Sequence, residues 1–260
     1  MRTKKFRKAL VLFALGVLAL STAVSTEVRA QAPAVDKAAV QILQRMTDYV
    51  GGLHQFSVNT ENDLEDVLAS GHRVDFDVYA SVTVSRPNQL RAERKGALID
   101  QIFYYDGKTL TLYNPYDNAY ATEPAPETIE GVLDYARESL GLIIPASDLI
   151  YRNAFQLLMQ DVKFAMVVDK TVINGVGCDH VLFSRPGVDF QVWVADSGPP
   201  LPMKYLVTDT SQPGMVSITT VMSGWNVAPA VTDGRFDFVA PTGAKKIGFM
   251  PIETSSGSKR

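Results

Sequence analysis

The sequence predicts an α+β fold: one large, curved antiparallel β-sheet with helices that cover its concave side. Three features of the sequence lead to this prediction. An amphipathic helical pattern follows the first thirty residues, a long stretch then alternates between apolar and polar residues, and a second helical region separates two groups of short strands. Strands and helices do not alternate regularly, which argues against a parallel sheet. An antiparallel sheet of roughly ten strands tends to curl, so the helices are expected inside the curve.

Residues 1–30 have the pattern of a secretory signal peptide. Five basic residues lie between Arg2 and Lys8, an uncharged apolar run follows, and small residues end the segment at Ala30. Signal peptidase accepts small side chains at these positions, so we expect cleavage after Ala30 and a periplasmic location. The alternative is an uncleaved membrane anchor, but the apolar run is shorter than the roughly 20 residues that span a bilayer. Residues 31–250 are expected to form a single domain, followed by a flexible polar tail at residues 251–260.

The composition restricts the partners of the mature chain. The whole sequence has 25 Lys and Arg and 28 Asp and Glu, and without residues 1–30 these become 19 and 27, a net charge of −8. An acidic chain is a poor ligand for nucleic acid or for anionic lipid surfaces. Cys178 is the only cysteine, so stability must come from a hydrophobic core and not from internal disulfides. We expect a monomer with no stable membrane insertion after cleavage.

The first half of the mature chain begins with one helix and continues as strands. The helix is expected between Asp36, a good N-cap, and the glycine pair at residues 51–52. Residues 72–85 then alternate with period two, which predicts a long half-buried strand. Asp106-Gly107 is typical of a hairpin turn. Shorter strands are expected at residues 90–93, 99–105, 109–114 and 119–123.

The second half contains two more helices and then more strands. Apolar residues recur at helical spacing in residues 129–140, and a third helix is expected at residues 148–159. Turn residues then separate several apolar segments. These strands are expected at residues 165–168, 180–185, 190–195, 203–209 and 215–225, with a last short strand at residues 236–238.

No catalytic or metal-binding motif is recognisable in the sequence. Cys178 and His180 share one face of a strand, but a zinc site needs more ligands than this pair, so a buried thiol and a surface imidazole are the simpler interpretation. His54 and His72 have no partner at ligand spacing. Carboxylates crowd residues 61–66 and recur at Asp75 and Asp77; such pairs can hydrolyse glycosides, but they are more often a solvated strand face. We expect no enzyme activity, no metal and no cofactor.

Aromatic residues gather in the central strands. Depending on the strand register, an inward-facing group is expected to contain Phe103, Tyr105, Leu110, Leu112, Tyr113 and Tyr120. Such a group is commonly plain core packing. It can also be the wall of a ligand cavity, because a strongly curved sheet leaves space that its own side chains do not fill. Both interpretations remain open at the level of the sequence.

The order of several motifs resembles a known superfamily. Arg86-Pro87 with a second arginine at Arg91, then Asp106-Gly107, then the segment from Tyr113 to Tyr120 are similar to the core of the LolA-like lipoprotein carriers. The later motifs resemble a family of predicted periplasmic proteins of unknown function near that superfamily. These motifs are Trp193 within residues 189–194, residues 200–204, Trp225 and residues 236–244.

The resemblance implies a half-open, LolA/LolB-like β-barrel with helices as a lid over an apolar cavity that receives lipid or lipoprotein acyl chains. Arg91 would hold the lid, although Ala92-Glu93 stands where the carriers have an aromatic residue. The ligand-binding residues would be Leu90, Phe103, Tyr105, Leu110, Leu112, Tyr120 and Leu133. The alternatives are a non-catalytic envelope interaction or stress module whose core is filled by its own side chains, and a hydrolase of an envelope polymer.

Overall fold

A computed structural model of the chain describes residues 34–97 and 99–249. The expected signal peptide at residues 1–30 and the expected tail at residues 251–260 lie outside these residues. In the described part, no helix has both the length and the apolar character needed to cross a membrane.

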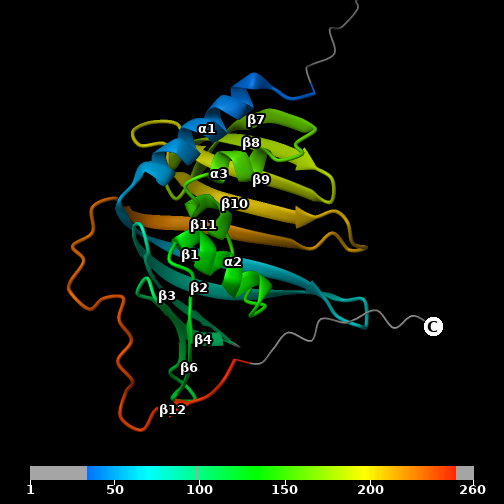
Figure 1. Cartoon of the computed structure of the whole chain (residues 1–260). Helices are drawn as coiled ribbons and strands as arrows, with labels where there is room; N and C mark the ends of the chain where they lie inside the picture. Colours follow the sequence, from blue (N-terminus) through cyan, green and yellow to red (C-terminus); the bar gives the residue numbers. More distant parts are fainter. Residues whose placement is uncertain (1–33, 98, 250–260) are drawn as a thin grey trace, which may run out of the picture. The chain divides into compact units, whose positions relative to one another are not determined.

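The described strands form a single twelve-stranded sheet, which bends as it passes from β7 to β6 (Figure 1). The strand order is β12-β6-β5-β4-β3-β2-β1-β11-β10-β9-β8-β7, and every neighbouring pair is antiparallel except β12 with β6. The predicted antiparallel sheet is therefore confirmed. The strands are β1 Gln55–Val67, β2 Arg73–Ser85, β3 Gln89–Gly96, β4 Ile99–Tyr105, β5 Thr109–Asn114, β6 Ala119–Pro124, β7 Phe164–Ile173, β8 Val176–Arg185, β9 Val188–Ala195, β10 Pro202–Asp209, β11 Ser217–Asn226 and β12 Lys245–Lys246.

The strand β1 joins two groups of strands at the centre of the sheet. It pairs with β2 on one side and with β11, far away in sequence, on the other. The sequence pattern predicts no strand at this position, because the carboxylates of residues 61–66 obscure the apolar alternation of Phe56, Val58 and Leu64. In the sheet Glu61, Asp63 and Glu65 alternate with the inward-facing Asn62 and Leu64, so a strand with one polar face accommodates them.

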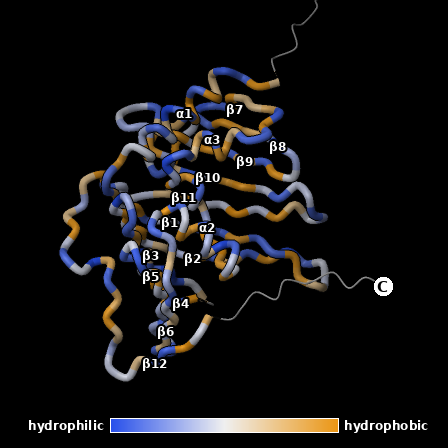
Figure 2. Tube along the Cα trace, viewed as in Figure 1, coloured by the Kyte–Doolittle hydropathy of each residue, from blue (hydrophilic) through white to orange (hydrophobic). Residues whose placement is uncertain are grey.

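The two faces of the sheet differ in what covers them. We call the face that carries the helices the inner face; Val58, Val84 and Tyr105 on it belong to the main hydrophobic core. The alternate residues along each strand lie on the outer face. Figure 2 shows the resulting mixture of apolar and polar residues along the strands. This is the pattern expected of an antiparallel sheet with one buried side.

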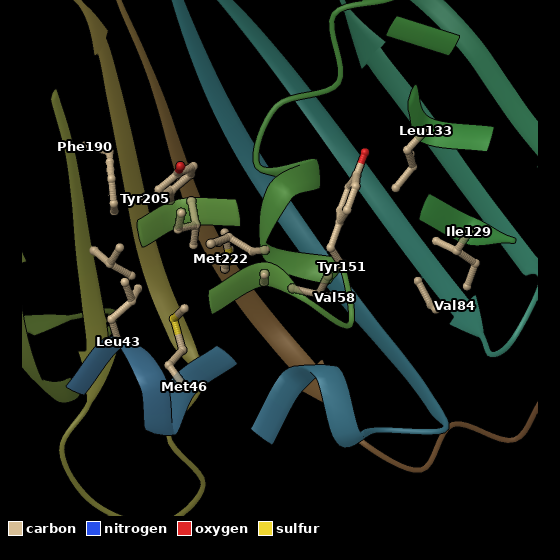
Figure 3. Close-up of a cluster of buried hydrophobic side chains, with 14 of the residues drawn as sticks. Leu43, Met46, Val58, Val84, Ile129, Leu133, Tyr151, Phe190, Tyr205 and Met222 are labelled. Atoms are coloured by element: carbon tan, nitrogen blue, oxygen red, sulfur yellow. The ribbon is translucent and has the colours of Figure 1, made fainter. Parts of the chain in front are cut away.

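The helix α1 (Lys37–Gly52) confirms the predicted first helix. The carboxylate of Asp36 accepts a hydrogen bond of 2.8 Å from the backbone N–H of Ala38 and caps the helix. Its apolar stripe is buried, and Leu43 and Met46 lie in the same cluster as Phe190 and Tyr205 (Figure 3). In Figure 1 α1 lies beside β7 to β9, so it covers that end of the inner face.

The remaining helices are shorter than the sequence predicts. The helix α2 (Ile129–Glu138) is capped by the hydroxyl of Thr128, which accepts a hydrogen bond of 3.0 Å from Gly131 N–H. The single helix expected at residues 148–159 is wrong: it is divided into a 3₁₀ turn, η1 (Ser147–Ile150), and α3 (Ala154–Met159). The break follows from tertiary contacts. Tyr151 has extended backbone, its side chain is buried, and its hydroxyl donates a 2.7 Å hydrogen bond to Asp134 of α2.

The last expected strand, at residues 236–238, is also wrong. Residues 227–249, which we call the C-terminal strap, run along the sheet, form no strand at residues 236–238 and contain β12 near their end (Figure 1). Phe238 of the strap packs on the outer face among three tyrosines, with ring centroids 4.9 to 5.5 Å apart. These tyrosines are Tyr104, Tyr113 and Tyr120. Aromatic contacts with the outer face, and not strand pairing, therefore hold Phe238 of this motif.

Both edges of the sheet are partly covered. At one edge the strap adds β12 in parallel to β6. At the other, Ala165 of β7 donates a 2.9 Å hydrogen bond to the carbonyl of Ala34 and accepts one of 2.9 Å from Asp36 N–H. Covered edges reduce the risk that the sheet pairs with another chain.

Candidate apolar ligand cavity

A cavity of about 80 Å³ lies between the inner face and the helical region. Its floor comes from β1 to β4 and from the end of β11, and its roof comes from η1 and from residues 139–146, which we call the lid loop. Nearly all the side chains around it are apolar. The lining residues are Val58, Thr60, Val82, Leu90, Ala92, Arg94, Phe103, Leu133, Leu142, Ile144, Ala146, Ser147, Leu149, Ile150, Pro202, Met222 and Trp225.

A second hollow of about 350 Å³ lies next to the cavity on the same face of the sheet. We call it the trough. It is lined by inner-face residues such as Leu64 and Val78, and it shares Thr60 and Ala92 with the cavity. The lid-loop residues Leu142 and Ile144 line both spaces. The lid loop therefore forms the wall between the two spaces.

The lid loop has few backbone hydrogen bonds. It belongs to no helix or strand, and Gly141 has a φ of 64°, which a glycine adopts at no steric cost. Leu142 N–H donates a 2.9 Å hydrogen bond to the carbonyl of Ala136. From the sheet, Arg94 donates one of 2.6 Å to the carbonyl of Ile143. A segment with so few internal bonds belongs to the part of a fold that opens at low free-energy cost.

The buried arginine Arg86 connects the sheet to the helical region. Its guanidinium donates hydrogen bonds of 3.1 Å to the carbonyl of Leu53 and 2.5 Å to the carbonyl of Ile150, and it lies 3.5 Å from the carboxylate of Glu130. Burial lowers the pKa of Arg86, and the charge of Glu130 opposes that shift. The side chain thus ties the end of β2 to η1 and α2. The sequence motif Arg86-Pro87 gave a signal for this residue, although no contact was predicted from it.

Three of the seven residues expected to bind a ligand line the cavity: Leu90, Phe103 and Leu133. Tyr105, Leu110 and Leu112 share the inner face of the sheet with Leu90 and Phe103 but pack in or against the core instead. Tyr105, which is fully buried, donates a 2.5 Å hydrogen bond from its hydroxyl to the carbonyl of Pro126. Its hydroxyl therefore points to the loop before α2, and burial raises the pKa of Tyr105 to about 12.

Tyr120 and Tyr113 do not face the cavity. The register pairs Tyr113 with Tyr120 and Leu112 with Ala121, so the two tyrosines lie on the face opposite to Leu112. Tyr120 instead packs on Phe238 of the strap. The prediction that both tyrosines face inward is therefore wrong. The turn at residues 114–118 sets the register that places them on the outer face.

Arg91 lies on the outer face as well. It pairs with Glu93 and its guanidinium lies 5.0 Å from the centre of the Tyr104 ring. Neither contact involves a helix or the lid loop. Other arginines of the sheet region make such contacts: Arg86 bonds to Ile150 of η1, Arg94 to Ile143 of the lid loop and Arg185 to Leu157 of α3.

Several cavity residues were missed by sequence reasoning. Val58 and Thr60 belong to the missed strand β1, and Met222 pairs across from Thr60 in β11. The lid-loop residues Leu142 and Ile144 fall between the expected helices. Their apolar run, bounded by Gly141 and Pro145, is a signal that could have marked a buried loop.

The polar residues outside the cavity do not form a recognisable catalytic centre. His180 stacks on Trp193 with ring centroids 4.0 Å apart and is hydrogen-bonded to Asp169 at 3.1 Å and to Gln191 at 2.8 Å. Cys178 is fully buried. Within residues 34–97 and 99–249, no three His, Cys, Asp or Glu side chains come together as a possible metal site.

Four carboxylates lie together on the outer face of β1 and β2. Asp63 pairs directly across from Asp77, and Glu65 pairs across from Asp75. Burial, and then the charges of Asp75, Asp77 and Glu65, raise the pKa of Asp63. One carboxylate oxygen of Asp63 is buried without a hydrogen-bond partner among the described residues. This group lies on the opposite face of the sheet from the cavity.

The fold is similar to that of several solved proteins at low sequence identity. An uncharacterized conserved protein from Thermus thermophilus is 11% identical with a TM-score of 0.48, over 82% of this chain and 99% of that one. LprF from Mycobacterium bovis is 15% identical with a TM-score of 0.49, over 78% and 99%. The lipoprotein LppX of Mycobacterium tuberculosis is 15% identical with a TM-score of 0.44, over 76% and 100%. No curated protein matches the chain.

A protein-family model matches most of the chain. The match covers residues 39–250, and the family is described as "Predicted periplasmic protein (DUF2092)". It extends from within α1 past β12, so it includes the whole sheet, the cavity and the strap. This confirms the resemblance expected from the motifs of the second half. The chain belongs to the DUF2092 family of predicted periplasmic proteins.

Proposed function

We propose that this protein binds a lipid, an acyl chain or a similar apolar ligand between the inner face of its sheet and the lid loop. The observation that carries the proposal is the apolar cavity beneath the lid loop, with the trough directly on the other side of Leu142 and Ile144. Leu90, Phe103 and Leu133 would contact the ligand. Tyr105, Leu110 and Leu112 would support this wall through the core.

The size of the cavity requires the lid loop to move. A free volume of about 80 Å³ is smaller than the roughly 150 Å³ of a cavity that binds benzene. Displacement of Leu142 and Ile144 would join the cavity to the trough and give one continuous apolar groove. Burying an acyl chain contributes about 0.8 kcal/mol per CH₂ group, so several methylenes offset a small cost of opening the loop.

The proposal is tested by looking for bound lipid and by measuring binding directly. Protein recovered from its native compartment is extracted with organic solvent and the extract is analysed by mass spectrometry. Purified protein is then titrated with a fluorescent fatty acid. We expect a bound acyl lipid and saturable binding; their joint absence would show that the proposed function is wrong.

A cavity-filling variant locates the binding site. Ala92 lines both the cavity and the trough, so Ala92→Trp places an indole where the ligand would lie. The matched control is Ser81→Trp, because Ser81 is exposed on the outer face of the neighbouring strand. We expect at least about tenfold weaker binding for Ala92→Trp and unchanged binding for Ser81→Trp. Thermal unfolding of each variant shows whether it is folded, since overpacking alone costs about 1–3 kcal/mol.

The small volume of the cavity also favours a second function, a non-catalytic envelope interaction module whose core is filled by its own side chains. This alternative predicts no bound lipid, no effect of Ala92→Trp on any apolar probe, and a protein partner that crosslinks to the folded domain. Neither function uses catalysis, in line with the expectation that the chain is not an enzyme. Both place the mature protein in the periplasm, with its first residue at Gln31. The N-terminal sequence of the exported protein tests that cleavage site.

A further inference from the structure

We propose that Arg94 binds the headgroup of the ligand, and that the ligand is therefore an anionic single-chain amphiphile with a carboxylate or phosphate headgroup. This inference rests on the proposed function and names the class of ligand for the same site. It is argued from the position of Arg94, from its hydrogen-bond partners and from the charges around it.

Among the described residues, Arg94 is the one cation that lines both the cavity and the trough. It lies on the inner face of β3, opposite Ala80 and Gln101 in the neighbouring strands. The residues that share both spaces with it include Val82, Ala92, Leu142 and Ile144, which are all apolar. A ligand headgroup at Arg94 would thus leave apolar surface on either side for its chain.

The hydrogen-bond partners of Arg94 are neutral. Its guanidinium donates 2.6 Å to the carbonyl of Ile143 and 2.5 Å to the side-chain oxygen of Gln101. Within the described residues it forms no ion pair, whereas Arg86 pairs with Glu130 and Arg91 pairs with Glu93. The strand alternation places the acidic neighbours Glu93 and Asp100 on the outer face.

A half-buried guanidinium without a counterion is stabilised in its charged form when an anion binds to it. Burial lowers the pKa of Arg94, and no carboxylate in the described part of the chain opposes this shift. The planar guanidinium matches the two oxygens of a carboxylate or a phosphate, and such charge-assisted hydrogen bonds are stronger than bonds to neutral carbonyls. An anion at Arg94 would therefore replace the carbonyl of Ile143.

This replacement would couple headgroup binding to opening of the lid loop. In the described part of the chain, the bond from Arg94 to the carbonyl of Ile143 is the side-chain hydrogen bond that links the sheet to the centre of the loop. When the headgroup accepts the hydrogen bonds of the guanidinium, Ile143 loses its bond to Arg94, and the adjacent Leu142 and Ile144 are no longer restrained by it. The same event that anchors the headgroup would thus open the path for the chain.

The experiment compares three amphiphiles with the same chain: dodecanoate, dodecyl phosphate and the uncharged 1-dodecanol. The anions are titrated into the full mature protein below their micelle concentrations and the alcohol below its solubility limit, and affinity is measured by calorimetry. We expect at least one of the two anions to bind roughly tenfold or more tightly than the alcohol. The stronger of the two anions identifies the headgroup.

Variants assign this preference to Arg94. In Arg94→Gln the ratio of anion to alcohol affinity is expected to fall to about one, and Arg94→Lys is expected to keep part of it. The control Arg91→Gln removes a cation from the outer face of the same strand and is expected to keep the full ratio. The ratio is read within each variant, so a general change in the lid loop or in stability does not mimic the effect.

The outcomes separate this inference from the proposed function. Equal affinity for the anions and the alcohol in the unmodified protein overturns the headgroup inference and leaves apolar binding intact. A preference that survives in Arg94→Gln overturns it too. If none of the three amphiphiles binds, both the proposed function and the inference are wrong.

Discussion

The guanidinium of Arg86, at the end of β2, donates a 2.5 Å hydrogen bond to the backbone carbonyl of Ile150 in η1. The same side chain also bonds to the carbonyl of Leu53, which follows α1, and pairs with Glu130 of α2. One arginine thus connects the sheet to three segments of the inner layer. Loss of this side chain would therefore remove three polar links between the sheet and the helical region at once.

Arg86→Met is expected to lower the free energy of unfolding by about 2–4 kcal/mol, because it leaves the carbonyls of Leu53 and Ile150 without their donor and removes the positive charge beside Glu130. Urea unfolding measures this loss. Arg73→Met is the matched control, since Arg73 is well exposed and pairs with Glu65 at the surface. We expect a loss of at most about 1 kcal/mol for the control. Equal losses for the two variants would contradict the role of Arg86.

Asp63→Asn is expected to stabilise the protein at neutral pH by up to about 1 kcal/mol, because it removes a like-charge pair with Asp77 across the two strands. The pKa of Asp63 is raised above its ordinary value of 3.8, so the folded state binds more protons than the unfolded state. The unmodified protein therefore loses stability as the pH rises from 3.8 through the native pKa. The stability that Asp63→Asn gains over the unmodified protein should thus vanish at about pH 3, where Asp63 is protonated in both states.

The control for this prediction is Glu61→Gln. Glu61 lies on the same face of β1, but its cross-strand neighbours Tyr79 and Val221 are uncharged. We expect little change in stability for the control at either pH. Unfolding curves at the two pH values distinguish the variants, and a gain for Asp63→Asn that persists in acid would count against the like-charge explanation.

Phe238→Ala is expected to detach the C-terminal strap from the outer face. Its ring contacts three tyrosines, and each aromatic pair contributes about 0.5–1.5 kcal/mol, so we expect a loss of about 1.5–4.5 kcal/mol. Limited proteolysis should cut the strap faster in this variant. The control is Val239→Ala, because Val239 is 83% exposed. Unchanged proteolysis of the strap in Phe238→Ala would disprove its anchoring role.

Cys178 is expected to be unreactive in the native protein. Its side chain is fully buried, and burial raises the pKa of the Cys178 thiol, so little thiolate is present at neutral pH. A thiol reagent such as dithionitrobenzoate should react slowly with the folded protein and quickly in urea. Cys178→Ser gives the background signal. Fast reaction under native conditions would instead indicate local opening of β8.

The elements with simple periodicity could be predicted from the sequence. The stripe of α1, the alternation of β2 and the Asp106-Gly107 turn each depend on neighbouring residues, so local patterns were sufficient. β1 was missed because its polar face carries the acidic residues of the Asp63 group. The prediction of one helix at residues 148–159 was wrong because the buried side chain of Tyr151 interrupts it. Tyr151 bonds to Asp134 of α2, a contact that the sequence alone does not reveal.

The candidate site was only partly predictable for the same reason. Leu90, Phe103 and Leu133 could be chosen because they belong to apolar faces that the sequence reveals. Tyr120 could not be excluded without the register of β5 and β6. Arg94 was overlooked because nothing local distinguishes it from Arg91 on the same strand. The alternation of the strand, and the position of the lid loop, separate the two arginines.

The pairing of β1 with β11 has a consequence for how the molecule folds. β2 to β6, and likewise β7 to β11, pair with neighbours in sequence, so each group can form through local contacts. β1 completes its pairing only when β11 arrives, and such distant contacts form slowly because a long loop must close first. Thr60 and Met222, which meet in that step, both line the cavity. The cavity is therefore expected to be among the last parts of the protein to form. A chain that ends before β11 would lack Met222 and Trp225 from the cavity lining, and its two groups of strands would not be joined into one sheet.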